Sequence, residues 1–285
     1  ETYGFINLKK KKISQKKIIE ILNYLKNNKI YTLDTSMEYK NVDKKIKLSK
    51  YGNWKIITKV NLNRFKHIKS ENKITNYLIK LVKLNASNLG VKKIEALLIH
   101  NVDSLFKPNG RAFFSALRKL KKLGYINKFG YSIYNFDLLE KIINNFKPDI
   151  IQCSYNIFDT RLNNKKIIKS IKKNKIEVHA RSIFLQGLLL LPLKNLPKKF
   201  MKWKKNFKKW DEWTKKNNCS KLEVCMNFVK SNSLIDRIIF GVQDLNQLKQ
   251  ILKIKFKKKI LLPSYFFSND INLINPLKWY DLNKN

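Results

Sequence analysis

A tyrosine five residues downstream of an aspartate, in the string TLDTSMEYK, is the strongest chemical signal in this chain. The two residues are Asp34 and Tyr39. The phenol of a tyrosine has a pKa of about 10, so it gives up its proton readily at neutral pH only when a cation stabilises the phenolate. Later apolar runs end in side chains that could serve it: Lys59 closes WKIITK, His100 closes IEALLIH, and Gln152 lies in PDIIQCSYN. These residue types predict proton-transfer chemistry.

The apolar runs that carry these side chains are separated by amphipathic stretches of helix length. This alternation is typical of buried parallel strands joined by crossover helices. Polar residues at the strand ends would then line one rim, which in a parallel α/β barrel is where active sites are built. The predicted strands are KIYTLDT, WKIITKV, IEALLIH, INKFGYS, DIIQCSY, IEVHARSIF and DRIIFGV.

Seven strand-helix units predict a (β/α)8 TIM barrel that lacks its first strand in this sequence. Tyr39 to Lys50 is predicted to be a loop and a helix, and Gly90 and Gly124 are predicted to end helices in a left-handed conformation. A doubly wound open sheet is the structural alternative, but it would concentrate its polar residues at one switch point. TYGFIN could also be a degraded edge strand. The length of 285 residues fits one domain over residues 1–285.

The composition is that of a folded protein, with 44% hydrophobic and 12% aromatic residues. A formal net charge of +41 raises the question of nucleic-acid binding. However, the basic residues are spread over nearly every predicted helix, and only six of the 61 are arginine. A phosphate-binding surface would favour the planar fork of arginine. We therefore predict solvated lysine faces and no nucleic-acid partner.

Three cysteines, Cys153, Cys219 and Cys225, are too few and too irregularly spaced for a disulfide framework or a zinc site. His67 and His179 have no carboxylate or cysteine at metal-ligand spacing, so we predict no metal. No run approaches the roughly 18 apolar residues that cross a bilayer. The sequence therefore predicts a cytoplasmic protein without a membrane partner, and it leaves the oligomeric state open.

From Tyr3 to about Leu252 the order of motifs resembles the aldo/keto reductase superfamily, whose members are (β/α)8 barrels that move a hydride between a nicotinamide cofactor and a carbonyl or alcohol. The motifs that carry the resemblance are LDTSMEY, ITKV, SNLGVKKIEALLIHN, LRKLKKLGYINKFGYSIYN, DIIQCSYNIFDTR, ARSIFLQGLL and IIFGVQDLNQLKQIL.

The resemblance implies catalytic roles for Asp34, Tyr39, Lys59 and His100. Tyr39 would be the general acid that protonates the carbonyl oxygen as hydride arrives, with Lys59 as its stabilising cation. Asp34 would hold Lys59 by an ion pair, and His100 would orient and polarise the substrate oxygen. Taken singly, each residue also has an ordinary structural explanation.

The same resemblance implies a cofactor, NADPH or NADH. Ser132 and Gln152 would hold the nicotinamide carboxamide, whereas Ile133 replaces an asparagine that many members have. Arg181 stands where many relatives place an aromatic ring on the nicotinamide, and its guanidinium plane could stack there. Asp244, near the adenosine end, would repel a 2'-phosphate. Residues implied for the diphosphate and adenosine are Ser182, Phe184, Gly187, Gly241 and Gln247.

We therefore predict an enzyme that reduces a small aldehyde or ketone, with sugar-derived carbonyls among its candidate substrates. The alternative is a catalytically silent barrel that binds nucleotide or a protein partner, because Ile133, Arg181 and Lys40 depart from the family pattern. Trp203, Phe207, Trp210 and Trp213 recur at helical spacing with lysines between them. That pattern predicts a packing stripe in preference to a membrane or nucleic-acid contact.

Overall fold

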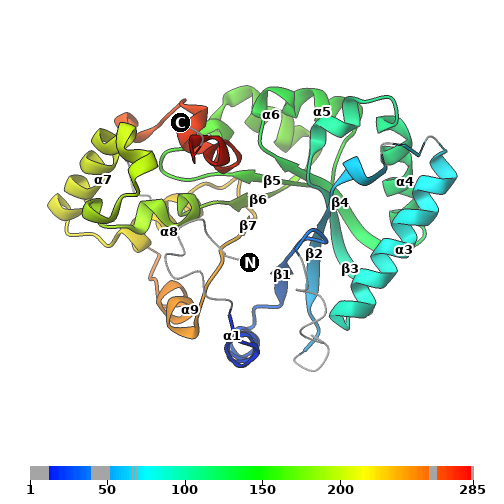
Figure 1. Cartoon of the computed structure of the whole chain (residues 1–285), viewed down its shortest axis with the longest axis horizontal. Coiled ribbons are helices and arrows are strands. Elements are labelled where there is room, and N and C mark those ends of the chain that lie inside the picture. Colours follow the sequence, from blue (N-terminus) through cyan, green and yellow to red (C-terminus); the bar gives the residue numbers. More distant parts are fainter. Residues whose placement is uncertain (1–12, 40–51, 66, 69, 257–261, 284–285) are drawn as a thin grey trace. The chain divides into compact units, whose positions relative to one another are not determined.

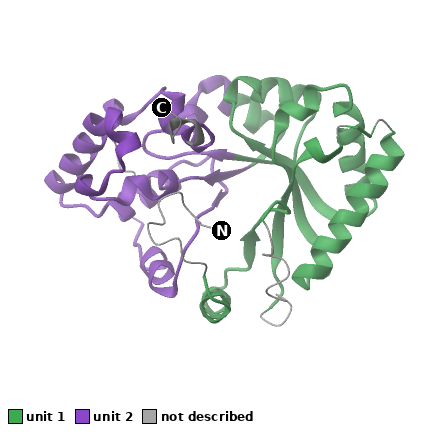
Figure 2. Cartoon of the chain, viewed as in Figure 1, with its two compact units in different colours: residues 1, 13–152, 169–177 green, residues 2–12, 153–168, 178–285 purple. Residues whose placement is uncertain are grey.

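Parallel strands and helices alternate along the chain in the computed structural model, which describes residues 13–39, 52–65, 67, 68, 70–256 and 262–283. The described residues form two compact units (Figure 2). The first unit comprises Ile13–Gln152 and Lys169–Glu177, and the second comprises Cys153–Ile168 and Val178–Asn285. The predicted helix within Tyr39 to Lys50 and the possible edge strand TYGFIN lie outside the described residues.

The first unit is built on parallel strands, and each pairs with the next one along the chain. They are β1 (Thr32–Asp34), β2 (Lys55–Val60), β3 (Ile94–Ile99), β4 (Ile126–Ile133) and the start of β5 (Ile150–Ser154). The backbone N–H of Asp149 donates to the carbonyl of Phe129 at 3.0 Å, which places β5 beside β4. The three residues of β1 are half-buried, whereas most residues of β2 to β5 are buried, as expected for a parallel sheet covered by helices.

Helices alternate with the strands, beginning with α1 before β1. In or reaching into the first unit they are α1 (Gln15–Asn27), α3 (Glu71–Leu89), α4 (Gly110–Lys122), α5 (Leu139–Asn145) and α6 (Lys165–Asn174). Ser70 caps α3 by accepting from the backbone N–H of Lys73, and Gly90 ends it at φ 67° in the left-handed conformation. Gly124, after α4, also has a positive φ of 79°. Helices α3 and α4 pack side by side (Figure 1).

A small cluster of buried side chains lies on one face of this sheet. Ile57, Ala96, Leu98 and Ile150 come from β2, β3 and β5. Between them, Gly130 on β4 has no room for a side chain, because a Cβ atom there would lie 2.1 Å from the carbonyl oxygen of Ile150. Strand β4 therefore approaches β5 more closely than any residue with a Cβ would allow.

The second unit contains the end of β5, most of β6 (Glu177–Arg181) and the short β7 (Arg237–Ile238), which pairs with β6 in parallel. Its helices are α7 (Lys204–Lys216), α8 (Lys221–Lys230), α9 (Leu245–Leu252) and α10 (Ile271–Ile274). Short 3₁₀ segments occur in both units, at Leu62–Phe65, Val102–Phe106, Phe136–Leu138, Arg161–Asn163, Leu185–Leu190, Leu193–Asn195, Lys198–Trp203, Ser264–Phe266 and Pro276–Asn283.

The tryptophan-rich stretch of the second unit is a packing stripe, as predicted. Trp203, Phe207 and Trp210 are buried. The rings of Trp210 and Phe266 meet edge to face at 5.6 Å between centroids, and the Trp210 indole N–H donates to the Leu189 carbonyl.

Among the described residues the structure has seven strands, all parallel, in an α/β arrangement, which confirms the α/β part of the predicted fold class. Three predicted strands are clearly shorter than expected: β1 keeps three residues of KIYTLDT, β6 ends at Arg181, where the prediction ran on to Phe184, and β7 keeps two residues of DRIIFGV. The absent first strand and the single domain stay predictions. In the described part of the chain, no helix is long and apolar enough to cross a bilayer.

The close approach at Gly130 gives a stability prediction. Gly130→Ala forces a methyl group against the Ile150 carbonyl, so we expect the free energy of unfolding to fall by about 1 to 3 kcal/mol in urea denaturation. Asn127→Ala, at an exposed position of the same strand, is the control and should change it by about 0.5 kcal/mol or less. Equal losses in the two variants would contradict the close approach.

Candidate active site

The strand register of the first unit shows how Asp34 and Lys59 are placed on the sheet. Asp34 lies opposite Ile57 in the strand pairing, and Lys59 lies opposite Leu98. Because alternate residues of a strand share a face, Lys59 points to the same side as Ile57 and the buried cluster.

The same alternation places three further side chains on that face. His100 follows Leu98 by two positions, Ser132 follows Gly130 by two, and Gln152 follows Ile150 by two. Their positions at or just past the strand ends match the rim on which the sequence predicts an active site.

An ion pair between Asp34 and Lys59 is the centre of this group. The Lys59 ammonium lies 2.5 Å from Oδ1 of Asp34 and also donates to the carbonyl oxygen of Thr35 at 3.1 Å. Lys59 is only 4% exposed, so these partners offset the energetic cost of burying an ammonium group. The predicted pairing of Asp34 with Lys59 is therefore present.

Gln152 joins the ion pair directly. Its amide Nε2 donates to Oδ2 of Asp34 at 2.8 Å, across 118 positions of sequence. The two carboxylate oxygens of Asp34 thus receive donors from different strands, Lys59 from β2 and Gln152 from β5. The sequence predicted both residues for the site but not the contact of Gln152 with Asp34.

Tyr39 is half-buried in the turn after β1, which is tied to β2 by backbone bonds. The Met37 N–H donates to the carbonyl of Lys59 at 3.0 Å, and the Tyr39 N–H donates to the carbonyl of Ser36. Nearby, the Glu38 carboxylate pairs with Arg64 on the 3₁₀ segment after β2. Tyr39 therefore follows by two positions a residue, Met37, that is bonded directly to the backbone of Lys59.

His100 stands just beyond the end of β3, where its N–H donates to the carbonyl of Val60. Its Nε2 lies 3.5 Å from the hydroxyl of Tyr134, and the two rings are tilted with centroids 6.4 Å apart. Sequence reasoning missed Tyr134. The available signal was its spacing of two from Ser132, which gives it the same facing at the end of β4.

Ser132 carries a buried hydroxyl group at the end of β4. It is 1% exposed, and its Oγ has no hydrogen-bond partner among the described protein residues. The same lack of a partner holds for the buried hydroxyls of Thr35, Thr58, Thr75 and Ser154. Ser132 differs from them in its predicted role, since a hydroxyl at the end of β4 can pair with a polar group such as a carboxamide. Ile133, its neighbour, is fully buried and apolar, so its side chain adds no hydrogen bond.

In the second unit, the segment after β6 has an unusual backbone. Ser182, Gln186 and Gly187 have φ values of 55°, 56° and 94°, and Leu185 also lies in the left-handed region. Non-glycine residues adopt this conformation at an energetic cost, and such strain concentrates at ligand sites. The half-buried Phe184 lies within this segment.

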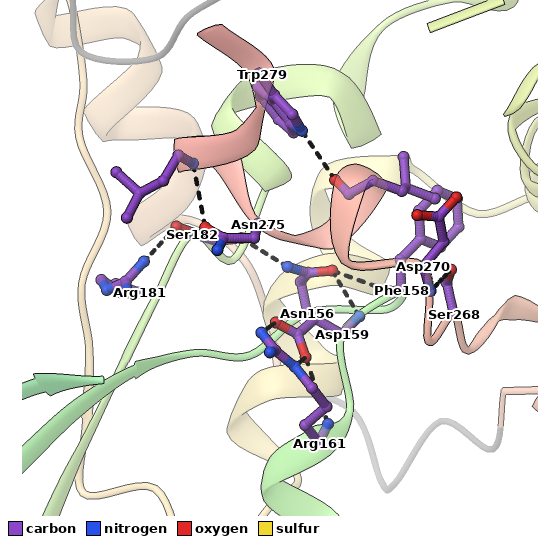
Figure 3. Close-up of polar contacts among 12 residues, drawn as sticks. Asn156, Phe158, Asp159, Arg161, Arg181, Ser182, Ser268, Asp270, Asn275 and Trp279 are labelled. Carbon is purple, nitrogen blue, oxygen red and sulfur yellow. Dashed lines mark hydrogen bonds and ion pairs between the residues drawn. The ribbon is translucent and has the colours of Figure 1, made fainter. Parts of the chain in front are cut away.

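Buried polar contacts hold that segment in place (Figure 3). Asn156 donates from Nδ2 to the carbonyl of Ser182 at 3.0 Å, and Arg181 donates from Nη1 to the Ser182 hydroxyl at 3.3 Å. The Asn156 side chain also accepts from the backbone N–H of Asp159, whose fully buried carboxylate binds Arg161 through Nε and Nη2, both at 2.8 Å.

The start of α9 is closed by its own side chains. The Asp244 carboxylate accepts from the backbone N–H of Gln247 at 2.9 Å, and the Gln247 amide oxygen accepts from the N–H of Gln243 at 2.8 Å. A carboxylate therefore sits at the positive end of this helix. Gly241 is exposed on the preceding loop.

The sequence profile of the Aldo/keto reductase family matches residues 2–266. The chain belongs to this family. Its predicted resemblance is thereby confirmed, and membership indicates an oxidoreductase. Comparison with curated protein sequences gave no match.

Solved aldo-keto reductases share the fold of this chain. AKR11C1 from Bacillus halodurans, in its holo form, is 18% identical to this chain, with a TM-score of 0.67 over 88% of this chain and 84% of its own. The thermostable aldo-keto reductase Tm1743, in complex with the inhibitor epalrestat, is 18% identical, with a TM-score of 0.64 over 88% of this chain and 85% of its own.

A buried thiol, that of Cys153, lies next in sequence to Gln152. Burial raises the pKa of the Cys153 thiol, next to Gln152, to about 12, although Arg181 partly opposes the shift. Cys153 therefore stays protonated and unreactive at neutral pH. The described residues include no cluster of three or more histidines, cysteines and carboxylates that could hold a metal ion.

The ion pair gives a prediction that needs no substrate. Asp34→Ala leaves the Lys59 ammonium buried without its carboxylate, so we expect the free energy of unfolding to fall by about 3 to 5 kcal/mol in urea denaturation. The control is Lys208→Ala, which removes the ion pair of Lys208 with Glu212, whose side chains are both 61% exposed. It should lower the free energy of unfolding by about 0.5 kcal/mol or less. Similar stability of Asp34→Ala and the unmodified chain would rule out a stabilising pair.

Proposed function

We propose that this aldo/keto reductase reduces an aldehyde or ketone, including sugar-derived ones, with NADPH or NADH in the cytoplasm. The observation that supports the proposal most is the buried Asp34 and Lys59 ion pair, which shares a sheet face with His100 and Ser132. No packing requirement of a parallel sheet calls for a buried ammonium at a strand end, whereas proton transfer from a tyrosine does.

In the proposed reaction Tyr39 is the general acid. Its phenol donates a proton to the carbonyl oxygen, and the resulting phenolate is stabilised by the Lys59 ammonium. Lys59 uses two of its three N–H groups for Asp34 and Thr35, which leaves one to offer to a phenolate. Asp34 acts as a positioning residue because it fixes the ammonium.

His100 is proposed to donate a hydrogen bond to the substrate oxygen and so fix the direction from which Tyr39 reaches it. The Tyr134 hydroxyl, 3.5 Å from His100 Nε2, would hold the imidazole ring in one orientation. Tyr134 is thus a second positioning residue on this side of the site.

The cofactor, when bound, supplies the hydride that reduces the carbonyl carbon. Ser132 would hold the carboxamide of the nicotinamide together with Gln152, and the unpaired Ser132 hydroxyl supports that assignment. Arg181 would lie on the ring, and the strained backbone of the following segment would wrap the diphosphate. The remaining proposed contacts to the diphosphate and adenosine are Ser182, Phe184, Gly187, Gly241 and Gln247.

The role of Tyr39 is tested by Tyr39→Phe, which removes only the hydroxyl. We expect kcat for the reduction of 4-nitrobenzaldehyde with NADPH or NADH to fall by about 10² to 10⁴, because general acid catalysis supplies about that much. The control is Tyr77→Phe, at a position 44% exposed on α3, which should keep its turnover. Unchanged kcat in Tyr39→Phe would refute this role.

Cofactor choice is tested at Asp244, whose carboxylate caps α9 near the proposed adenosine site. Asp244→Asn keeps a capping oxygen but removes the charge, so repulsion of a 2'-phosphate decreases. We expect KM for NADPH to fall about fivefold while KM for NADH stays within about twofold. If KM for NADPH and KM for NADH changed by the same factor, Asp244 would have no selective effect on the 2'-phosphate.

A catalytically silent barrel that binds nucleotide is the second candidate. It is favoured by Ile133, which stands where many family members have an asparagine. The buried apolar side chain of Ile133 cannot make the hydrogen bond that an asparagine would offer to the carboxamide. Fluorescence titration with NADPH and NADH, run beside the turnover assay, distinguishes the two. Nucleotide binding without reduction of any aldehyde in a panel of aromatic, aliphatic and sugar aldehydes would select the silent barrel.

A further inference from the structure

The carboxylate of Asp34 is held from two sides. Lys59 donates to Oδ1 at 2.5 Å, and Gln152 donates to Oδ2 at 2.8 Å. A carboxylate bonded through one oxygen can turn about its last side-chain bond, whereas one bonded through both oxygens is fixed in orientation. Gln152 therefore supplies the second point of attachment.

Gln152 is itself firmly placed. Its side chain is 1% exposed, and it extends from β5 on the face that carries Ile150 and the buried cluster. A buried amide that donates to a charged carboxylate makes a stronger hydrogen bond than one between neutral groups. One of the two Nε2 N–H groups is committed to Asp34, so the amide keeps its other N–H and its oxygen Oε1 for a ligand beside it.

We propose that Gln152 is a positioning residue for proton transfer, which fixes Asp34 and through it the Lys59 ammonium that serves Tyr39. This role rests on the proposed reductase function and adds to the carboxamide contact proposed for Gln152. Without the amide, Asp34 can rotate, and Lys59 then samples positions in which its free N–H no longer faces the phenol. A displacement of about 1 Å in such a group lowers turnover by roughly a hundredfold.

The kinetic test uses Gln152→Met, which has a similar length but no N–H donor. We expect kcat for 4-nitrobenzaldehyde to fall by about tenfold to a hundredfold. The loss of activity at high pH should also move to higher pH, since a less stabilised phenolate makes Tyr39 hold its proton longer. A residue that only binds the carboxamide would raise KM for the cofactor and leave the pH profile in place.

Ser132→Ala is the matched control, because Ser132 shares the proposed carboxamide role but has no contact with Asp34 among the described residues. Ser132→Ala should raise KM for NADPH or NADH and leave the pH at which activity is lost unchanged. If Gln152→Met behaves like Ser132→Ala in both measurements, the positioning role is wrong.

Gln152→Glu provides a rescue experiment with a side chain of the same shape. At about pH 8 the introduced carboxylate faces the Asp34 carboxylate and the two repel, so kcat should be low. At about pH 5.5 the pair should take up a proton, and the O–H then replaces the missing N–H donor. We expect kcat relative to the unmodified enzyme to recover by about tenfold over this range. A constant ratio would overturn the proposal.

A double-mutant cycle on stability separates this proposal from the proposed function, because it needs neither cofactor nor substrate. Gln152→Met should lower the urea midpoint in the unmodified chain but by less than about half as much in an Asp34→Leu background. Ser132→Ala should give the same shift in both backgrounds. Equal shifts of the urea midpoint for Gln152→Met in the two backgrounds would contradict the positioning role. The expected smaller shift in the Asp34→Leu background, found for a protein that shows no turnover, would contradict only the reductase proposal.

Discussion

The buried ammonium of Lys59 is the constraint on which the rest of the first unit depends. An ammonium that is 4% exposed costs several kcal/mol in desolvation unless an anion lies beside it. The anion is Asp34 on the neighbouring strand, and the carbonyl of Thr35 completes the contact. The register of β1 against β2 is therefore fixed by charge as well as by packing, since a slip of one residue would turn Asp34 to the opposite face.

Much of this arrangement could be predicted from sequence because polar residues stand at the ends of largely apolar runs. WKIITK closes on Lys59 and IEALLIH closes on His100, which predicted both the strands and the position of these two residues at the strand ends. The contact between Gln152 and Asp34 could not be predicted in the same way. It spans 118 positions, and strand periodicity gives the face of each side chain but not the distance between strands. Tyr134 was missed because its partner, His100, comes from another strand.

The segment after β6 shows where local pattern misleads. Ile183, Phe184 and Leu185 continue the apolar run of IEVHARSIF, so propensity predicts that the strand continues. The strand ends at Arg181 instead, and Ser182 takes a positive φ of 55°. The Asn156 side chain binds the Ser182 carbonyl, and a buried Asp159 and Arg161 pair stabilises the loop that carries Asn156. This tertiary network overrides the local preference, as is common where backbone strain serves a site.

Burial explains why one lysine matters in a chain with 61 basic residues. By residue type alone Lys59 cannot be told apart from the lysines of the predicted helices. In the part of the chain that the structure describes, it is the one lysine that is buried, and it lies beside a carboxylate whose second oxygen binds an amide. Exposed lysines are solvated and exert little force on a distant phenol because water and salt screen them. A lysine shielded from water acts at short range on the group next to it, so the large net charge and the buried ion pair of Lys59 with Asp34 are separate properties of this protein.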